Sequence, residues 1–301
     1  MKLLLTGAYN YTQEQFNRLA DIGYEIVFAQ DERIPLEIEV SDINAIVCNS
    51  LFMYNDIAKF ESLRIIQLTS AGTERVPIEY IRKNEILLFN AKGVYSIPMA
   101  EWIILKILEI YKQSRYFYNN QANHKWNKNR ELLELTGKTT AIIGFGSVGT
   151  EIAKRLKAFD SKVIGVGRRE IDSKFIDMYI NVRDIDSALE NADIVVITLP
   201  LTSSTRHLFN KQKLMKMKDD AVLINISRGE IIDENALIEL INDGKFLGVA
   251  LDVFENEPLD DSSLWDYENV IVTPHNSFVS DKVNERLFEL IVSNLSVGDK
   301  I

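Results

Sequence analysis

An apolar strand that runs into a glycine-rich turn and then a helix constrains this fold more than any other feature of the sequence. The turn reads Gly144-Phe145-Gly146-Ser147-Val148-Gly149, a G-x-G-x-x-G pattern that follows the apolar residues 141–143. Gly144 permits a tight turn, Gly146 lets the backbone approach a pyrophosphate, and Gly149 allows the helix to pack closely on the strand. Free N–H groups at the start of such a helix bind phosphate oxygens. Because both strand and helix are present, the pattern predicts a dinucleotide-binding unit of the Rossmann type rather than a purely structural turn.

Short apolar runs alternate with helix-period segments along the chain, which indicates parallel sheets covered by helices on both faces. At 301 residues the chain exceeds one ordinary domain, so two α/β lobes with a cleft between them are expected. Strands are expected at residues 3–5, 25–28, 45–48, 65–68 and 86–89, and then at 139–143, 162–166, 194–198, 221–226, 247–251 and 270–272. Helices are expected at 13–21 (with Thr12 as N-cap), 98–118, 148–158, 185–190, 211–217, 234–242 and 280–295. The long helix 98–118 suits a connection between the lobes, and a polar, turn-rich stretch is expected at 119–129.

Composition and charge exclude several classes of protein. The net charge of −10 argues against nucleic acid or an anionic membrane surface as the main partner. The single cysteine, Cys48, excludes an internal disulfide and a cysteine-based metal cluster. No apolar run reaches the roughly 20 residues of a membrane span, and the apolar stretch at the N-terminus is too short for a signal peptide. A cytoplasmic protein is therefore expected.

Three later segments, each at the end of an expected strand, carry side chains that suit the reduction of a keto acid. Ligands gather at the carboxyl ends of strands in open α/β sheets. Arg228 supplies a permanent cation that matches a carboxylate, and His275 supplies a proton because imidazole titrates near neutrality. Glu257 is expected to orient the imidazole and to favour its protonated form. A nicotinamide cofactor would provide the hydride, so no metal is expected.

Each of these residues also has an ordinary structural interpretation when it is taken alone. Arg228 fits a loop cation, His275 fits the end of a turn, and Glu257 fits a surface acid. Only their occurrence together favours a catalytic set. The other two histidines, His124 and His207, lie in polar stretches without such neighbours and are interpreted as structural or surface residues.

The strand after the glycine turn ends in arginines rather than in an acid. An NAD-binding unit carries an acid about 20 residues beyond the turn, whereas here Gly167 is followed by Arg168 and Arg169. Arginine can hold the 2′-phosphate of NADP, which a carboxylate would repel. The sequence therefore favours NADP over NAD. NAD remains an alternative cofactor, because Glu170 could serve as the missing acid and because the two arginines could simply be solvated.

The order and spacing of these segments resemble those of the D-isomer-specific 2-hydroxyacid dehydrogenases over essentially the whole chain. The motifs that carry the resemblance are the glycine turn and then Ala192-Asp193-Ile194-Val195, Leu199-Pro200-Leu201-Thr202, Ser227-Arg228-Gly229, Leu251-Asp252-Val253-Phe254, Glu257-Pro258 and Thr273-Pro274-His275. The resemblance implies hydride transfer between NAD(P)H and a small 2-keto acid, with Arg228, Glu257 and His275 as the catalytic trio. It also implies a homodimer formed through the nucleotide lobe.

The resemblance further implies a division of labour between two lobes that close on the substrate. A smaller, flavodoxin-like substrate lobe would span residues 1–97, completed by 276–301, and the dinucleotide-binding domain would span 98–275. The cofactor would contact Ser147, Val148, Pro200, Thr205, Ile226 and Asp252, the last of which would hold the nicotinamide carboxamide. The substrate carboxylate would meet backbone N–H groups of Ala71, Gly72 and Thr73, with Val94 and Tyr95 beside that pocket.

Departures from the family pattern narrow the expected substrate. Phosphoglycerate dehydrogenases carry a basic residue in the first lobe where this chain has Asn49-Ser50, so a phosphorylated substrate is not expected. Together with the arginine pair, this resembles the glyoxylate and hydroxypyruvate reductases of the family. Two alternatives stay open: an NAD-dependent D-lactate-type dehydrogenase, and a nucleotide-sensing, corepressor-like binding protein. The complete trio favours an enzyme.

Overall fold

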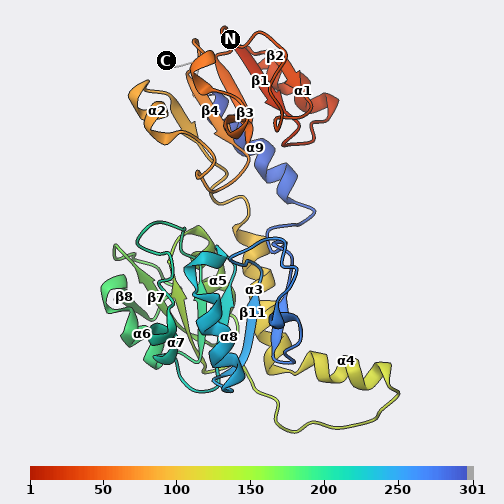
Figure 1. Ribbon diagram of the computed structural model, residues 1–301, viewed down its shortest axis with the longest axis vertical. Helices are drawn as coiled ribbons and strands as arrows, with labels where there is room; N and C mark the ends of the chain where they lie inside the picture. The colour runs from red at the N-terminus through yellow and green to blue at the C-terminus, as the bar shows by residue number, and fades with distance from the viewer. Residues whose placement is uncertain (297–301) are drawn as a thin grey trace. The chain divides into compact units, whose positions relative to one another are not determined.

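The computed structural model describes residues 1–296, and the chain divides into two compact units (Figure 1). Unit 1 consists of Met1–Tyr95 together with the C-terminal segment that begins at Ser280, and unit 2 is Ser96–Val279. The family pattern places these boundaries at 97/98 and 275/276. Each unit has its own parallel sheet and its own buried core, so each is described by itself.

Unit 1 is built on a five-stranded parallel sheet with the order β2-β1-β3-β4-β5, which is the predicted flavodoxin-like order. Its strands are β1 (Lys2–Thr6), β2 (Glu25–Ala29), β3 (Ala45–Cys48), β4 (Ile65–Leu68) and β5 (Leu87–Phe89), and its helices are α1 (Gln13–Asp21), α2 (Ile78–Lys83) and α9 (Val283–Leu295). The helix α1 begins after Thr12 because the Thr12 hydroxyl accepts a hydrogen bond from the Gln15 N–H in a capping box. Buried aliphatic side chains line both faces of the sheet, as parallel strands require.

Unit 2 is built on a seven-stranded parallel sheet with the order β12-β11-β10-β9-β6-β7-β8. Its strands are β6 (Thr139–Ile143), β7 (Lys162–Gly167), β8 (Met178–Asn181), β9 (Ile194–Ile197), β10 (Ala221–Asn225), β11 (Phe246–Leu251) and β12 (Val270–Val272). Its helices are α3 (Ser96–Tyr111), α4 (Ser114–Ala122), α5 (Ser147–Lys157), α6 (Ile185–Asn191), α7 (Lys211–Met215) and α8 (Glu234–Asn242). The direction of winding reverses between β6 and β9, and ligands bind beside the carboxyl ends of strands at such a switch point. The predicted Rossmann-type sheet is confirmed.

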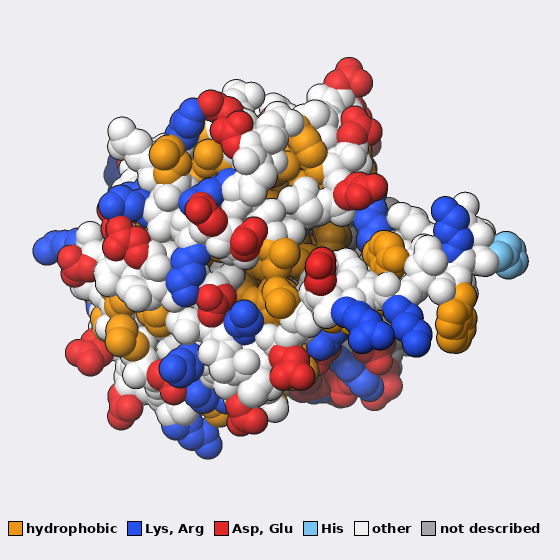
Figure 2. Space-filling model, turned by 90° about the horizontal axis from the view of Figure 1, so that it is seen from below, with side chains coloured by type: hydrophobic (Ala, Val, Ile, Leu, Met, Phe, Trp, Pro, Cys, Tyr) orange, Lys and Arg blue, Asp and Glu red, His pale blue; other side chains and the backbone are white. Residues whose placement is uncertain are grey.

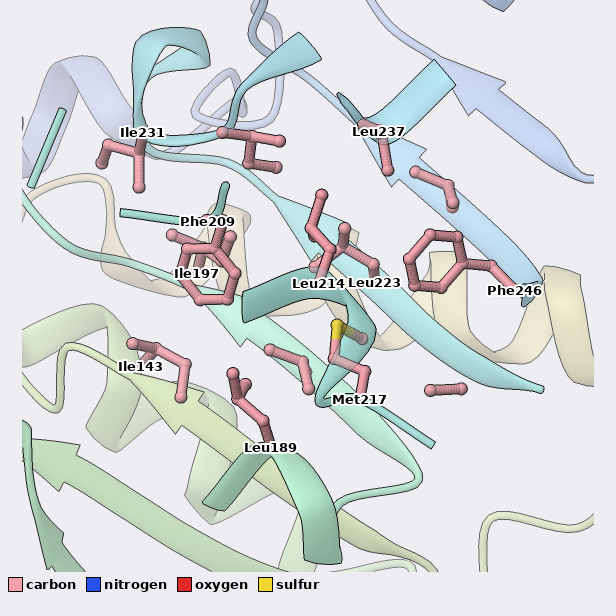
Figure 3. Packing of buried hydrophobic residues seen from close by; sticks show 14 of the residues in the cluster. Ile143, Leu189, Ile197, Phe209, Leu214, Met217, Leu223, Ile231, Leu237 and Phe246 are labelled. Atoms are coloured by element: carbon pink, nitrogen blue, oxygen red, sulfur yellow. The ribbon is translucent and has the colours of Figure 1, made fainter. Parts of the chain in front are cut away.

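One face of the unit 2 sheet is covered by a cluster of buried side chains. Figure 3 shows part of this cluster. Leu189 of α6, Leu214 of α7 and Leu237 of α8 converge there on strand side chains. Phe209 belongs to the same cluster and is fully buried, and its backbone pairs with Ile232 in an isolated parallel bridge. Replacing a buried phenylalanine by alanine costs roughly 3–5 kcal/mol. The segment around Phe209 is therefore firmly held to the start of α8.

The helix expected at 98–118 is broken in the structure. Gln113 has a left-handed φ of 48°, so α3 ends at Tyr111 and α4 begins at Ser114. The break is held by a distant residue, since the Asn129 Nδ2 donates to the Gln113 Oε1 at 2.6 Å. The stretch expected to be turn-rich from 119 begins instead with the last turn of α4. None of the helices within residues 1–296 is long and apolar enough to cross a membrane.

Strand β8 is absent from the prediction. It has four residues, lies at the edge of the sheet, and has no fully buried side chain. Its apolar run, residues 178–180, is only three residues long and shows no alternation, so the pattern of hydrophobic residues gives only a weak signal for it.

Candidate active site

The glycine turn has the geometry that a pyrophosphate needs. Gly144 has a φ of 104°, and a Cβ on it would lie 2.9 Å from the carbonyl carbon of Thr198. A Cβ on Gly149 would lie 3.2 Å from the Ile142 Cγ2, so α5 packs closely on β6. A Cβ on Gly146 would meet no atom of residues 1–296 within 4 Å, which leaves the space beside its backbone open. Because α5 has no side-chain cap, its first N–H groups can bind phosphate oxygens.

The other predicted cofactor residues follow neighbouring strands of the same sheet. Arg168 and Arg169 directly follow β7 and are exposed, and within residues 1–296 neither forms an ion pair. Pro200 and Thr205 follow β9 and are joined, since the Thr205 hydroxyl donates to the Pro200 carbonyl at 2.8 Å. Ser147 and Val148 form the first turn of α5. Ile226 follows β10, but its side chain is buried in the core, which leaves only its backbone for a cofactor.

His275 and Glu257 form a close pair. The His275 Nδ1 lies 2.9 Å from the Glu257 Oε2, and the two side chains are 39% and 37% exposed. The Glu257 Oε1 accepts a hydrogen bond from the Phe254 N–H at 3.1 Å, which fixes the carboxylate on its own loop. With Nδ1 directed at the carboxylate, Nε2 is the ring nitrogen that can meet a substrate.

A buried carboxylate holds the segment that carries His275. Asp252, at the end of β11, is fully buried and accepts from the Thr273 hydroxyl at 2.5 Å. It also accepts from the backbone N–H groups of Asn276 at 2.8 Å and Ser277 at 2.9 Å. The backbone N–H of His275 donates to the Asp252 carbonyl at 2.8 Å. Asp252 therefore shapes the histidine loop, and its predicted contact with a nicotinamide carboxamide stays a prediction.

Arg228 lies at the same edge of the sheet. The strands β10, β11 and β12 are neighbours in register, with Asn225 opposite Leu251 and Leu251 opposite Val272, so the segments that follow them emerge together. The Asn225 side chain shapes the turn before Arg228, since its Nδ2 donates to the Arg228 carbonyl at 3.0 Å. The Arg228 Nη1 donates to the carbonyl of Ser227 at 2.7 Å. A cation, an imidazole and a carboxylate thus share one edge of unit 2.

A second histidine–carboxylate pair, whose carboxylate lies on the loop of Glu257, was missed by the sequence analysis. The His207 Nε2 lies 2.9 Å from the Glu255 Oε1, two residues before Glu257 in the chain. The expectation that His207 has no such neighbour is wrong, although its side chain is 45% exposed, as expected for a surface residue. No signal within either segment reveals the pair, because His207 and Glu255 follow different strands and meet only through the order of the sheet.

The residues expected to bind the substrate carboxylate form one loop region of unit 1. Ala71, Gly72 and Thr73 follow β4, and the Asn90 Nδ2 donates to the Ala71 carbonyl at 2.7 Å. The hydroxyl of Tyr95 donates to the backbone carbonyl that precedes this loop, and burial raises the pKa of Tyr95. The side chain of the predicted Val94 is buried in the core of unit 1.

Unit 1 also places a cation where the sequence analysis expected none. The Arg75 Nη1 lies 3.3 Å from the Ser50 Oγ. The segment at Ser50 is fixed by Glu32, a carboxylate that is only 5% exposed and accepts from the backbone N–H groups of Asn49 and Ser50. The prediction against a phosphorylated substrate rested on the absence of a basic residue at Asn49-Ser50, and Arg75 supplies a cation beside Ser50.

A glycine turn at the switch point, with an arginine and a histidine–carboxylate pair at the same edge of the sheet, defines a nicotinamide-dependent dehydrogenase. A family model described as D-isomer specific 2-hydroxyacid dehydrogenase, NAD binding domain, matches residues 104–277. The chain therefore belongs to the D-isomer-specific 2-hydroxyacid dehydrogenase family, and unit 2 contains its domain for the nicotinamide cofactor.

Known relatives support the assignment of the chain to this family. Glyoxylate reductase from Pyrococcus horikoshii is 31% identical over 283 residues, which cover 89% of this chain and 84% of that protein. Hydroxypyruvate reductase from Thermotoga maritima is 33% identical over 219 residues, 71% of each protein. The crystal structure of a glyoxylate reductase from Paecilomyes thermophila matches with a TM-score of 0.84 at 24% identity, over 98% of this chain and 94% of that one, and supports the fold.

Proposed function

We propose that this protein reduces small 2-keto acids to D-2-hydroxy acids with NAD(P)H, as a reductase of the glyoxylate and hydroxypyruvate type. The observation that carries the proposal is the pairing of His275 with Glu257 at 2.9 Å, at the sheet edge that also carries Arg228. Unit 2 would hold the cofactor through Gly144, Gly146 and the start of α5, and unit 1 would bind the substrate carboxylate. When bound, the reduced nicotinamide supplies the hydride.

The trio then performs the remaining chemistry. Arg228 binds the carboxylate of the keto acid and draws electron density toward the carbonyl oxygen, because its charge is permanent. His275 donates a proton from Nε2 to that oxygen as negative charge develops there. Glu257 keeps the imidazole oriented and stabilises its protonated form. In the oxidative direction His275 accepts the proton from the hydroxyl group instead.

We infer a preference for NADP from Arg168 and Arg169. Both guanidinium groups follow β7, where an NAD-binding unit has an acid, and both are exposed. A 2′-phosphate gains charge-assisted hydrogen bonds from such groups. An NAD-dependent D-lactate-type dehydrogenase is the alternative, and it predicts that neither arginine affects the choice of cofactor.

The deciding experiment is the oxidation of NADPH and NADH, side by side, with a panel of keto acids. The panel contains glyoxylate, hydroxypyruvate, pyruvate and longer 2-keto acids, and because of Arg75 it also contains keto acids with a second anionic group. Turnover of glyoxylate or hydroxypyruvate with NADPH ahead of NADH supports the proposal. Tight cofactor binding without turnover of any of them favours a corepressor-like binding protein.

We also propose that two copies pair through unit 2. A cavity of about 660 Å³ opens between α3, α4 and β12, and Figure 2 shows hydrophobic side chains gathered in a hollow on this side of the unit. Tyr118 and Trp126, in and after α4, are 65% and 94% exposed, and a partner would cover such large apolar groups. Light scattering on a size-exclusion column should give twice the mass of one chain, and Trp126→Ser should shift it toward the monomer. A monomeric wild type would contradict the proposal.

The cytoplasmic location stays a prediction that cell fractionation would test.

A further inference from the structure

The loop from Val253 to Pro258 carries two carboxylates, and each faces a histidine. Glu257 faces His275, the proposed proton donor, at 2.9 Å. Glu255 faces His207, also at 2.9 Å. Only the first pair has a role in the proposed function, so the second requires its own explanation.

Glu255 is also locked to the start of α8. The Glu234 N–H donates to the Glu255 Oε1 at 3.1 Å, and the Glu255 N–H donates to the Glu234 Oε2 at 3.2 Å. This reciprocal arrangement brings two carboxylates together, and burial followed by the charge of Glu255 raises the pKa of Glu234. Two neighbouring carboxylates repel each other, so the arrangement needs a donor or a cation beside it. His207 supplies that donor on the exposed side of Glu255.

His207 stands on a backbone that cannot easily move away. Its N–H donates to the Glu230 carbonyl at 2.7 Å, and its φ is 50°. Phe209, two residues later, is fully buried, and Figure 3 shows it among the core side chains below Ile231. The preceding residue, Arg206, has its guanidinium 3.6 Å from the Glu230 carboxylate. The imidazole is therefore presented to Glu255 from a fixed position.

A short stretch of rigid backbone connects Glu255, which contacts His207, to Glu257 of the catalytic pair. Phe254 lies directly before Glu255, and its N–H holds the Glu257 carboxylate at 3.1 Å. The backbone of Phe254 also lies against Gly229, where no Cβ would fit. A shift of Glu255 therefore moves the N–H that holds Glu257, and with it the carboxylate that orients His275.

We propose that His207 is a positioning residue, which fixes Glu255 and thereby holds Glu257 in place against His275. The inference rests on the proposed function only in so far as the pair of Glu257 and His275 is catalytic. The placement itself follows from contacts within unit 2.

The first test compares His207→Ala and His207→Gln in steady-state kinetics. The alanine variant loses the donor to Glu255, and we expect kcat to fall by about tenfold or more, because small displacements of catalytic groups are costly. The dissociation constant of NADPH should not change, since the glycine turn follows another strand and Thr205 is held by its own hydrogen bond to the Pro200 carbonyl at 2.8 Å. The amide of the glutamine variant can donate to Glu255, so His207→Gln should restore most of the lost kcat. Lys211→Ala is the matched control, because Lys211 is a similarly exposed cation whose ion pair, with Glu239, joins α7 to α8 and does not contact the loop.

The second test combines His207→Ala with His275→Ala. Without the imidazole of His275, the position of Glu257 no longer matters, so His207→Ala should lower the residual kcat by a clearly smaller factor than it lowers kcat of the wild type. A general loss of folded protein would instead lower kcat by the same factor in both backgrounds. Equal factors, or a His207→Gln variant as slow as His207→Ala, would overturn the proposal.

A third measurement does not depend on turnover. The chain has three histidines, so the imidazole N–H signals can be assigned by NMR with single variants. We expect the downfield Nδ1–H signal of His275, which reports its hydrogen bond to Glu257, to weaken or shift in His207→Ala and to stay in place in His207→Gln and Lys211→Ala. If this holds while the wild type reduces no keto acid, the proposed function fails and the positioning role stands. An unchanged His275 signal in His207→Ala would refute the positioning role even if the enzyme is active.

Discussion

Gly229 offers the sharpest test of how the catalytic loop is placed. A Cβ at this position would lie 1.8 Å from the carbonyl carbon of Phe254 and 2.1 Å from its carbonyl oxygen. Because these are backbone atoms, no rotation of a side chain relieves the contact. An ordinary contact begins at 3.4 Å, so Gly229→Ala requires the loop that carries Glu257 to retreat by the difference, about 1.6 Å.

The size of that displacement sets the expected effects. Overpacking of this kind typically costs about 1–3 kcal/mol of stability, and a 1 Å misplacement of catalytic groups can cost about 10²-fold in rate. We therefore expect Gly229→Ala to lower kcat by about 10²-fold or more, to lower the melting temperature by several degrees, and to bind NADPH as the wild type does. Steady-state kinetics, thermal melting and a fluorescence titration of the cofactor measure the three effects separately.

Gly248→Ala is the matched control. Gly248 lies in β11, the strand that leads into the same loop, and a Cβ there would lie 2.7 Å from the Ile110 Cγ2. That atom is the end of a side chain, so the clash is relieved inside the core without moving Phe254. The control should lose stability and keep kcat. If Gly229→Ala keeps kcat within a few-fold, or if both variants lose kcat in proportion to their loss of stability, the loop position does not govern catalysis.

Three further predictions follow from the site. His275→Ala should lower kcat by about 10²–10⁴-fold while fluorescence titration shows NADPH still bound, and a drop of only a few-fold would mean that the proton donor is another group. Arg168→Ala should raise the dissociation constant of NADPH more than that of NADH, whereas equal increases would remove its role at the 2′-phosphate. Burial and the charge of Glu255 raise the pKa of Glu234 in the folded protein. The ionised Glu234 therefore destabilises the fold at pH values above the ordinary pKa of glutamate, and the effect disappears well below that pKa. Glu234→Gln should therefore raise the melting temperature at pH 7 and lose this advantage near pH 4, and an equal gain at both values would contradict the reasoning.

The interior of both units is predictable from sequence because parallel strands are buried on both faces. Such strands are continuous apolar runs, and the expected strands at 45–48, 65–68, 139–143 and 270–272 coincide with β3, β4, β6 and β12. The break at Gln113 is not predictable in this way. The polar run 112–115 contains no glycine or proline and equally fits an exposed turn of a continuous helix. The break is stabilised by contacts from Asn129 and from the carbonyl of Leu133.

The same distinction applies to the candidate site. Arg228, Glu257 and His275 each belong to a short motif at the end of a strand, so the three motifs together are visible in the sequence and predict the set. His207 and Arg75 belong to no such motif. Their neighbours, Glu255 and Ser50, come from other segments and are brought near only by the order of the strands.

Two independent sets of contacts hold the two halves of the site in unit 2. The glycine turn is fixed by the close approach of Gly144 to the backbone that follows β9. The catalytic pair is fixed by the buried carboxylate of Asp252, which anchors the histidine loop, and by Glu255, which anchors the loop of Glu257. Since these contacts share no residue, a substitution such as Gly229→Ala, which displaces the loop of Glu257, should lower kcat and leave cofactor affinity unchanged. A chain with an intact glycine turn and a displaced loop would still bind the nucleotide, which is how a binding protein without catalysis can arise on the same fold.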